Sequence, residues 1–288
     1  MPIPFWQRPS FVLLCGALIV FISIGIRNSF GLFMRPLSFG MGWGREALSL
    51  ALATQALLIG AAAPFAGMVA DRWGAPRVIM LGGTIFAIGV FLMAQSTTPT
   101  GIFAAGGLLG GIGLGACGLP LILTVVAQVA PEKRRSLWLG IVAAGSVGGQ
   151  LVLIPMSQFL ISNHDWTFGL TALALMAGII IPLAYATSSA MTASAGKDTT
   201  ISLGEALKEA ALHRGFWLLT LGFFVCGFQV QFMSVHLPAF IADQGLGAKL
   251  GAYVLMLIAV CNMFGSPAFG YLGGLYSKKN LLSGIYLA

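Results

Sequence analysis

Long apolar segments separated by short polar connections recur along this 288-residue chain, and they leave few folds open to it. A helix needs about 20 apolar residues to cross the hydrocarbon core of a bilayer. Eight segments have this length, and a ninth begins at Asn280 and reaches the last residue, Ala288. We place them near residues 11–34, 47–69, 78–97, 102–128, 138–162, 168–188, 215–241 and 250–273. The pattern predicts an all-α polytopic membrane protein.

Composition agrees with this class and argues against others. Hydrophobic residues make up 58% of the chain and charged residues 8%, whereas a soluble domain carries about 25% charged residues. The net charge of +7 includes no basic run longer than Lys133-Arg134-Arg135, which gives nucleic-acid binding little support. No Ser-His-Asp set or metal-ligand cluster is visible. We therefore expect neither an enzyme nor a metal or cofactor site.

The basic residues of the connections predict the orientation in the membrane. With the N-terminus inside, eleven Lys and Arg residues lie on the cytoplasmic side and three lie outside. The inner group is Arg8, Arg72, Arg77, Lys133, Arg134, Arg135, Lys197, Lys208, Arg214, Lys278 and Lys279, and the outer group is Arg35, Arg45 and Lys249. The positive-inside rule then predicts a multi-pass inner (plasma) membrane protein with a cytoplasmic N-terminus.

One long connection divides the chain into residues 1–188, with six spans, and residues 215–288, with two spans and the start of a third. Within residues 189–214, Ser202-x-x-Glu205 forms a capping box, followed by apolar residues at helical spacing. This pattern predicts a short amphipathic helix on the cytoplasmic surface. The two parts also repeat, because Gly25-Ile-Arg-Asn-Ser-Phe30 aligns with Gly227-Phe-Gln-Val-Gln-Phe232. Such repeats place a substrate site near the midplane, between the halves.

Arg27 lies inside the first span, while no Asp or Glu lies inside any predicted span. A charge at bilayer depth costs roughly 2.5–3.5 kcal/mol and usually marks a pathway or binding site. The residues therefore predict an anionic ligand, and the guanidinium suits a carboxylate because it donates two parallel hydrogen bonds. Ser23 shares the helix face of Arg27, and the repeat makes Gln229 its counterpart. In the alternative interpretation, Arg27 snorkels or bridges helices through backbone carbonyls.

Three other polar residues, Gln55, Gln150 and Asn262, lie deep in spans and complete the candidate substrate-binding set. Taken singly, each fits an interhelical hydrogen bond better than a substrate contact. Small residues form two seams that predict close helix packing. These seams are Gly107, Gly111 and Gly115 in the fourth span and Gly145 and Gly149 in the fifth.

The connection after the second span reads Gly67-Met-Val-Ala-Asp71-Arg72-Trp-Gly74-Ala-Pro-Arg77. It resembles the signature loop of the major facilitator superfamily. Within that superfamily, Ser29-Phe-Gly-Leu-Phe33, Gly42-Trp-Gly-Arg45, Pro131-Glu-Lys-Arg-Arg-Ser136 and Phe216-Trp217 leading into His236-Leu-Pro238 are similar to the monocarboxylate and oxalate–formate exchange branch. The resemblance implies that Asp71 latches onto a helix N-terminus in the second half, with Gly67, Arg72, Gly74 and Arg77 shaping this gating loop. Gly67 and Gly74 are expected to let helix ends approach closely.

The chain departs from this branch at three places. Ala75-Pro76 stands where basic residues are usual, Gly274 replaces the acid of the second loop copy, and span eight has Asn262 but no basic residue. The resemblance implies secondary active transport of small organic anions, monocarboxylates above all, by alternating access and with protons or a counter-anion. Two alternatives stay open. The first is a truncated, non-transporting fragment, because such carriers have twelve spans and this chain stops within its ninth. The second is a drug/proton antiporter, which would require acids inside the spans.

Overall fold

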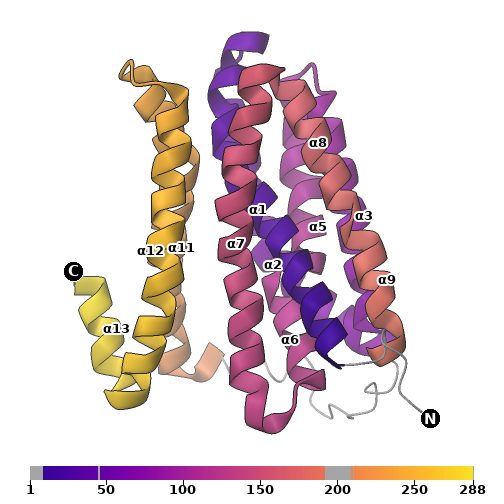
Figure 1. The fold of residues 1–288 in the computed structure, drawn as a ribbon, viewed down its shortest axis with the longest axis vertical. Helices are drawn as coiled ribbons and strands as arrows, with labels where there is room; N and C mark the ends of the chain where they lie inside the picture. The colour runs from indigo at the N-terminus through magenta and orange to yellow at the C-terminus, as the bar shows by residue number, and fades with distance from the viewer. Residues whose placement is uncertain (1–8, 45, 192–208, 210, 288) are drawn as a thin grey trace.

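The computed structural model describes residues 9–44, 46–191, 209 and 211–287, and these residues form helices without any strand (Figure 1). The all-α class predicted from the sequence is therefore confirmed. The helices are α1 (Pro9–Met41), α2 (Glu46–Trp73), α3 (Ala75–Ala94), α4 (Pro99–Ile102), the π-helix η2 (Phe103–Leu109), α5 (Gly110–Cys117), α6 (Leu119–Val129), the 3₁₀ turn η3 (Glu132–Arg134), α7 (Arg135–Asn163), α8 (Trp166–Gly178), α9 (Ile180–Met191), α11 (Arg214–Asp243), α12 (Ala248–Leu275) and α13 (Lys278–Leu287).

Seven segments of the described chain are long and apolar enough to cross a membrane, and they match the first seven predicted spans. They are Pro9–Met41, Glu46–Trp73, Ala75–Ala94, Pro99–Val129, Leu137–Asn163, Trp166–Thr187 and Arg214–Asp243. The eighth predicted span corresponds to α12, whose apolar described stretch is Lys249–Gly265, and α13 stands at the start of the ninth. The amphipathic helix predicted after Ser202 lies almost wholly outside the described residues.

Two predicted spans are interrupted, and each break lies shortly before a proline. The fourth span changes direction at Gly118, whose ψ of −179° is extended, before Pro120 enters the first turn of α6. The sixth span divides at Ile179, and its N–H bonds to the Met176 carbonyl three residues back. Pro182 has no N–H to donate to the Gly178 carbonyl one turn earlier. The sequence predicted continuous helices because hydropathy does not register these missing donors.

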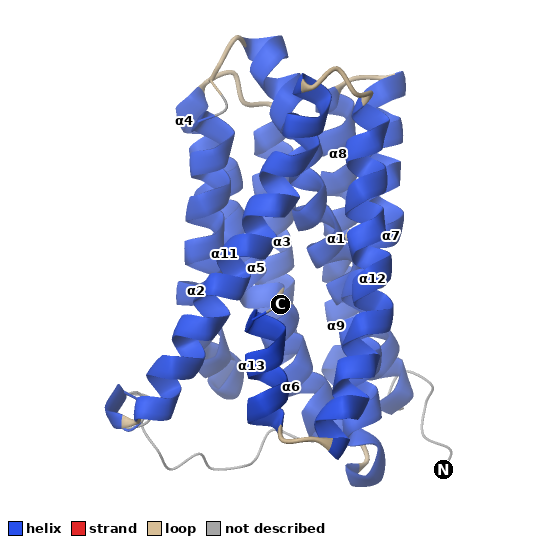
Figure 2. Ribbon diagram, turned by 90° about the vertical axis from the view of Figure 1, so that its left-hand side faces the viewer, coloured by secondary structure: helices blue, strands red, loops and turns tan. Residues whose placement is uncertain are grey.

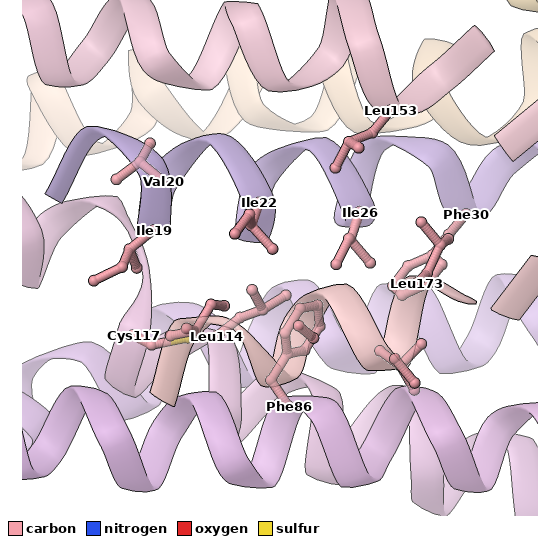
Figure 3. Packing of buried hydrophobic residues seen from close by; sticks show 14 of the residues in the cluster. Ile19, Val20, Ile22, Ile26, Phe30, Phe86, Leu114, Cys117, Leu153 and Leu173 are labelled. Atoms are coloured by element: carbon pink, nitrogen blue, oxygen red, sulfur yellow. The ribbon is translucent and has the colours of Figure 1, made fainter. Parts of the chain in front are cut away.

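The core surrounds α1, which packs against α6, α7, α8, α9 and α11. Figure 3 shows one face of α1 directed at the neighbouring helices. Ile26 and Phe30 of α1 are almost fully buried there, together with Phe86 of α3 and Leu114 of α5. Leu153 of α7 covers α1 from the other side. The first span is thus the centre of the bundle that residues 9–191 form.

Close helix packing through the glycine seams is confirmed. Gly107, Gly111 and Gly115 all face α2. A Cβ atom added at Gly111 would lie 2.7 Å from the Cβ of Leu58, and one added at Gly115 would lie 2.7 Å from the Cβ of Ala62. Neither contact leaves room for a larger residue.

The second seam joins α7 to α1. A Cβ atom added at Gly145 would lie 2.7 Å from the Ala17 carbonyl oxygen. A Cβ atom added at Gly149 would lie even closer to the Phe21 carbonyl oxygen. The backbones of α1 and α7 therefore touch at two points about one helical turn apart, in the most extensive helix pair of the described residues.

The helices α11 and α12 lie beside α1 and α7, on the side away from α3, α8 and α9 (Figures 1 and 2). α11 runs parallel to α1, and both end at the top of Figure 1. We call this the distal end of the bundle and the opposite end, near Pro9 and Trp73, the proximal end. The contact between α1 and α11 joins the N-terminal bundle to the later helices, and it carries the polar residues described next.

Candidate functional site

Arg27 lies near the middle of α1, eighteen residues after Pro9 and fourteen before Met41. At 1.5 Å per residue it is about 27 Å from one helix end and about 21 Å from the other. If the roughly 30 Å hydrocarbon core is centred on this helix, Arg27 lies about 3 Å from the midplane. The sequence placed it nearer the end of the span, because α1 was expected to stop at residue 34. The longer helix disfavours the snorkelling interpretation.

The guanidinium of Arg27 spans the boundary between α1 and α11. Its Nη2 donates a hydrogen bond of 2.9 Å to Oε1 of Gln231, and the pair is partly buried. Its Nε is buried and has no hydrogen-bond partner. Among the described residues, no acidic group forms an ion pair with Arg27. Arg27 therefore does bridge α1 and α11, but its partner is the neutral side chain of Gln231, and its Nε–H makes no hydrogen bond.

The bond to Gln231 shows that a residue other than Gln229 faces Arg27. Gln229 is exposed on another side of α11. Two residues along a helix correspond to a rotation of about 200°. Alignment of the repeats identifies equivalent chain positions, whereas the crossing of α1 and α11 decides which side chain meets Arg27. The predicted pairing of Arg27 with Gln229 is replaced by Arg27 with Gln231.

Ser23 is fully buried, and its hydroxyl donates to the Val20 carbonyl of its own helix at 3.4 Å. Burial in the packed core leaves it no surface to present to a ligand in this conformation. Ser29, six residues further along α1, is equally buried and donates to the Gly25 carbonyl at 2.9 Å. The polar stripe expected along α1 therefore reduces to Arg27 at the α11 contact.

The remaining candidates lie apart from Arg27. Gln55 is 1% exposed, and its Nε2 donates at 2.8 Å to the Gly106 carbonyl inside the π-helix η2, while its Oε1 has no partner. This is an interhelical hydrogen bond, as expected for a single polar residue deep in a span. Gln150 donates to the Ser146 carbonyl of its own helix at 3.4 Å. Asn262 is exposed on α12.

A cavity of about 380 Å³ lies between α1, α7 and α11, distal to Arg27. Its walls include Gly31, Arg35 and Phe39 of α1, Gln158 and Ile161 of α7, and Pro238 and Ala242 of α11. The sequence missed this site because Arg35 was assigned to a connection. The continuation of α1 through Pro36 to Met41 brings Arg35 into the helix, two turns beyond Arg27.

Similarity to known proteins identifies the fold family. The sequence model of the Major Facilitator Superfamily matches residues 14–288. The chain belongs to this superfamily. It is 23% identical over 276 residues to the uncharacterized MFS-type transporter YcxA of Bacillus subtilis (strain 168), covering 90% of this chain and 64% of YcxA. It is 28% identical over 231 residues to monocarboxylate transporter 11 of Mus musculus, covering 78% of this chain and 49% of that protein. The chain thus spans about half to two thirds of these relatives.

A solved structure shows the same superfamily fold. The bacterial homolog of the human lysosomal transporter Spinster, in an inward-facing and unoccupied conformation, superimposes with a TM-score of 0.69. The match covers 96% of this chain and 64% of the other at 18% identity. This likeness establishes the fold, and the family membership favours a transporter over an enzyme.

In this superfamily member, the signature loop lies at the proximal end, between α2 and α3. Gly74 has φ +88°, a left-handed conformation that a side chain would strain. No described atom lies within 4 Å of a Cβ added at Gly67 or Gly74. The close approach expected from these glycines is therefore absent here, and Gly74 serves instead to turn the backbone.

The charged residues of the loop are exposed. Arg77 donates to the Trp73 carbonyl at 3.4 Å, which caps the end of α2. Asp71 and Arg72 are exposed, and within the described part of the chain neither side chain has a hydrogen-bond or ion-pair partner. The latch expected for Asp71 stays a prediction.

Proposed function

We propose that this protein is a secondary transporter of small organic anions, with monocarboxylates as the preferred class, and that it works by alternating access in the inner (plasma) membrane. The N-terminus and the proximal end lie on the cytoplasmic side in this proposal. The signature loop with Asp71, Arg72 and Arg77 then acts at the cytoplasmic end as a gate. Relatives named monocarboxylate transporters support the substrate class.

One observation carries the proposal: a partly buried arginine, whose buried Nε has no hydrogen-bond partner, lies near the middle of a spanning helix at the contact between two groups of helices. Arg27 contributes an unpartnered Nε, and Gln231 accepts from Arg27 through its Oε1, which leaves its amide N–H groups as donors. A carboxylate placed between them would receive hydrogen bonds from both helices. Bonds of this charge-assisted kind are about twice as strong as neutral ones.

The position of the binding site between two groups of helices also supports alternating access. The substrate would touch α1 of the N-terminal bundle and α11 of the later helices at once. A ligand shared by two bodies favours the conformation in which both contact it. Movement of α11 against α1 would then expose Arg27 first to one side and afterwards to the other. The other substrate candidates, Gln55, Gln150, Asn262, Ser23 and Gln229, are not part of this contact.

Equilibrium binding tests the substrate site. Radiolabelled propionate is titrated against the purified chain in lipid nanodiscs. Arg27→Gln is expected to weaken binding by about 150-fold or more, because it removes two charge-assisted hydrogen bonds of about 1.5–3 kcal/mol each. Arg27→Lys keeps the charge but loses the paired geometry, so a loss of about tenfold is expected. Arg134→Gln, an exposed arginine at the proximal end, is the matched control.

Uptake into proteoliposomes tests transport and coupling. Propionate accumulation driven by a proton gradient would identify symport, whereas dependence on a preloaded counter-anion would identify exchange. Wild-type protein that binds propionate but moves none under either condition would refute the transport proposal. Propionamide, the neutral analogue, is expected to compete with neither binding nor uptake.

A further inference from the structure

The distal cavity holds a second arginine on the same stripe of α1 as Arg27. Arg27, Gly31 and Arg35 follow one another at intervals of four residues and lie on one helix face. The two arginines are about 12 Å apart along the axis. Arg27 lies on the proximal side of Gly31, and Arg35 lies in the cavity on the distal side.

Between the two arginines, α1 and α11 are in direct contact at Gly31. A Cβ added there would collide with the Ser234 carbonyl oxygen and lie 3.1 Å from the Cα of Val235. In this conformation α1 and α11 touch at Gly31, between the distal cavity and Arg27. A molecule that moves from the cavity to Arg27 along this face of α1 meets that contact.

Arg35 is held loosely in the cavity. Its Nε lies 3.8 Å from Oδ1 of Asp243, within ion-pair distance but too far for a hydrogen bond. The same Nε is buried and has no hydrogen-bond partner, and the guanidinium lies 5.3 Å from the centre of the Phe39 ring. Both side chains of the ion pair are partly exposed, at 40% and 34%. Exposed pairs of this kind contribute little and are displaced easily.

The walls of the cavity define the kind of ligand that fits it. Arg35 and Gln158 are its polar side chains, and Gln158 already donates to Ser162 at 2.9 Å. The rest of the lining is apolar and includes Phe39, Ile161 and Pro238. Its volume falls within the range of small-molecule sites. One cation beside an apolar wall suits a carboxylate with a short hydrocarbon tail.

We propose that the cavity around Arg35 is a loading site for the anionic substrate, in which Asp243 holds the arginine until a carboxylate replaces it. The substrate then passes to Arg27 when the contact of Gly31 with Ser234 opens. This inference rests on the proposed function and adds a second anion site to it. Asp243 competes with the substrate, so loss of the acid and loss of the arginine have opposite effects on binding.

Thiol protection tests the loading site in the full chain. Ile161→Cys places a thiol on the α7 wall, in a background in which the exposed Cys226 and Cys261 are replaced by serine. Cys15 and Cys117 are buried and stay in place. The rate of modification by methyl methanethiosulfonate, a small neutral reagent, is measured in nanodiscs with increasing propionate. Propionamide at equal concentration controls for effects of the tail.

We expect propionate, but not propionamide, to slow the modification. Asp243→Asn should lower the half-protecting propionate concentration by about two- to fivefold, in line with an exposed ion pair. Arg35→Gln should abolish protection, Arg35→Lys should keep part of it, and Arg27→Gln should leave it unchanged. If Arg27 does not bind the substrate, the equilibrium titration of Arg27→Gln will show this, whereas the thiol-protection assay will not be affected.

Three results would overturn the loading site. The first is absence of protection in the chain that retains Arg35 and Asp243. The second is protection that survives Arg35→Gln. The third is a shift in the same direction for Arg35→Gln and Asp243→Asn, which would identify the pair as a structural bridge and not as a competitor for substrate.

Discussion

Gly31→Ala should weaken anion binding at Arg27 without touching either Arg27 or Gln231. The added methyl group would collide with the Ser234 carbonyl oxygen, so α1 and α11 must separate by roughly 1 Å, an overpacking strain of about 1–3 kcal/mol. Arg27 is one helical turn away, and its 2.9 Å bond to Gln231 would lengthen beyond hydrogen-bond range. A carboxylate could then contact one helix but not both.

The expected loss is one charge-assisted hydrogen bond, about 1.5–3 kcal/mol, or between about tenfold and 150-fold in propionate affinity. Equilibrium titration in nanodiscs measures it. Gly227→Ala is the matched control, because it changes the same residue type on α11 where nothing lies within 4 Å of the new methyl group. Affinity within twofold of wild type for Gly31→Ala, in a protein of unchanged helix content, would refute the dependence of the site on this contact.

Three further predictions concern the scaffold, and reversible unfolding in mixed micelles measures all of them. Gln55→Leu should destabilise the protein by about 1–3 kcal/mol, because it leaves the Gly106 carbonyl of the π-helix without its donor. Gln150→Leu removes a hydrogen bond within one helix and should have less effect. Equal losses of stability in the two variants would argue against a special role for Gln55. Gly149→Ala should lower the free energy of unfolding by about 1–3 kcal/mol, because the new methyl group would collide with the Phe21 carbonyl. Gly140→Ala, with open space around the new methyl group, should be neutral or stabilising. Gly74→Ala should lower the free energy of unfolding by about 1–2 kcal/mol, because alanine is strained at a φ of +88°. The control is Gly60→Ala, where the added methyl group meets open space. Equal stability of the two variants would show that the loop changes its backbone conformation to accept alanine.

The placement of the spans could be predicted from the sequence because hydrophobicity over 20 residues decides where a helix crosses a bilayer. The glycine seams were predictable for a similar reason, since small residues four apart line one helix face. The breaks at Gly118 and Ile179 were not predicted. Pro120 and Pro182 follow these breaks and each lacks a hydrogen-bond donor, which a sum over 20 residues does not detect. Proline alone does not locate a break either, because α1 continues through Pro36.

The candidate site was predicted in part. Arg27 stood out because a charge inside an apolar span is costly, and this signal depends on one residue alone. Its partner on α11 depends on how the two helices are rotated and cross, which the repeat does not encode. The repeat therefore indicated Gln229, whereas Gln231 makes the contact. Arg35 was missed because the first span was expected to end near residue 34, whereas α1 continues through Pro36 to Met41 and brings Arg35 to the cavity.

The central claim, that Arg27 binds a carboxylate, is tested most directly by nuclear magnetic resonance of arginine side chains. The chain is labelled with ¹⁵N at the arginine Nε positions, and the Arg27 signal is assigned by its loss in Arg27→Lys. Because the Arg27 Nε–H makes no hydrogen bond in this structure, a bound carboxylate should move its resonance strongly. We predict a saturable shift with propionate and none with propionamide. An Arg27 signal that stays unmoved while propionate binds elsewhere on the protein would contradict the account.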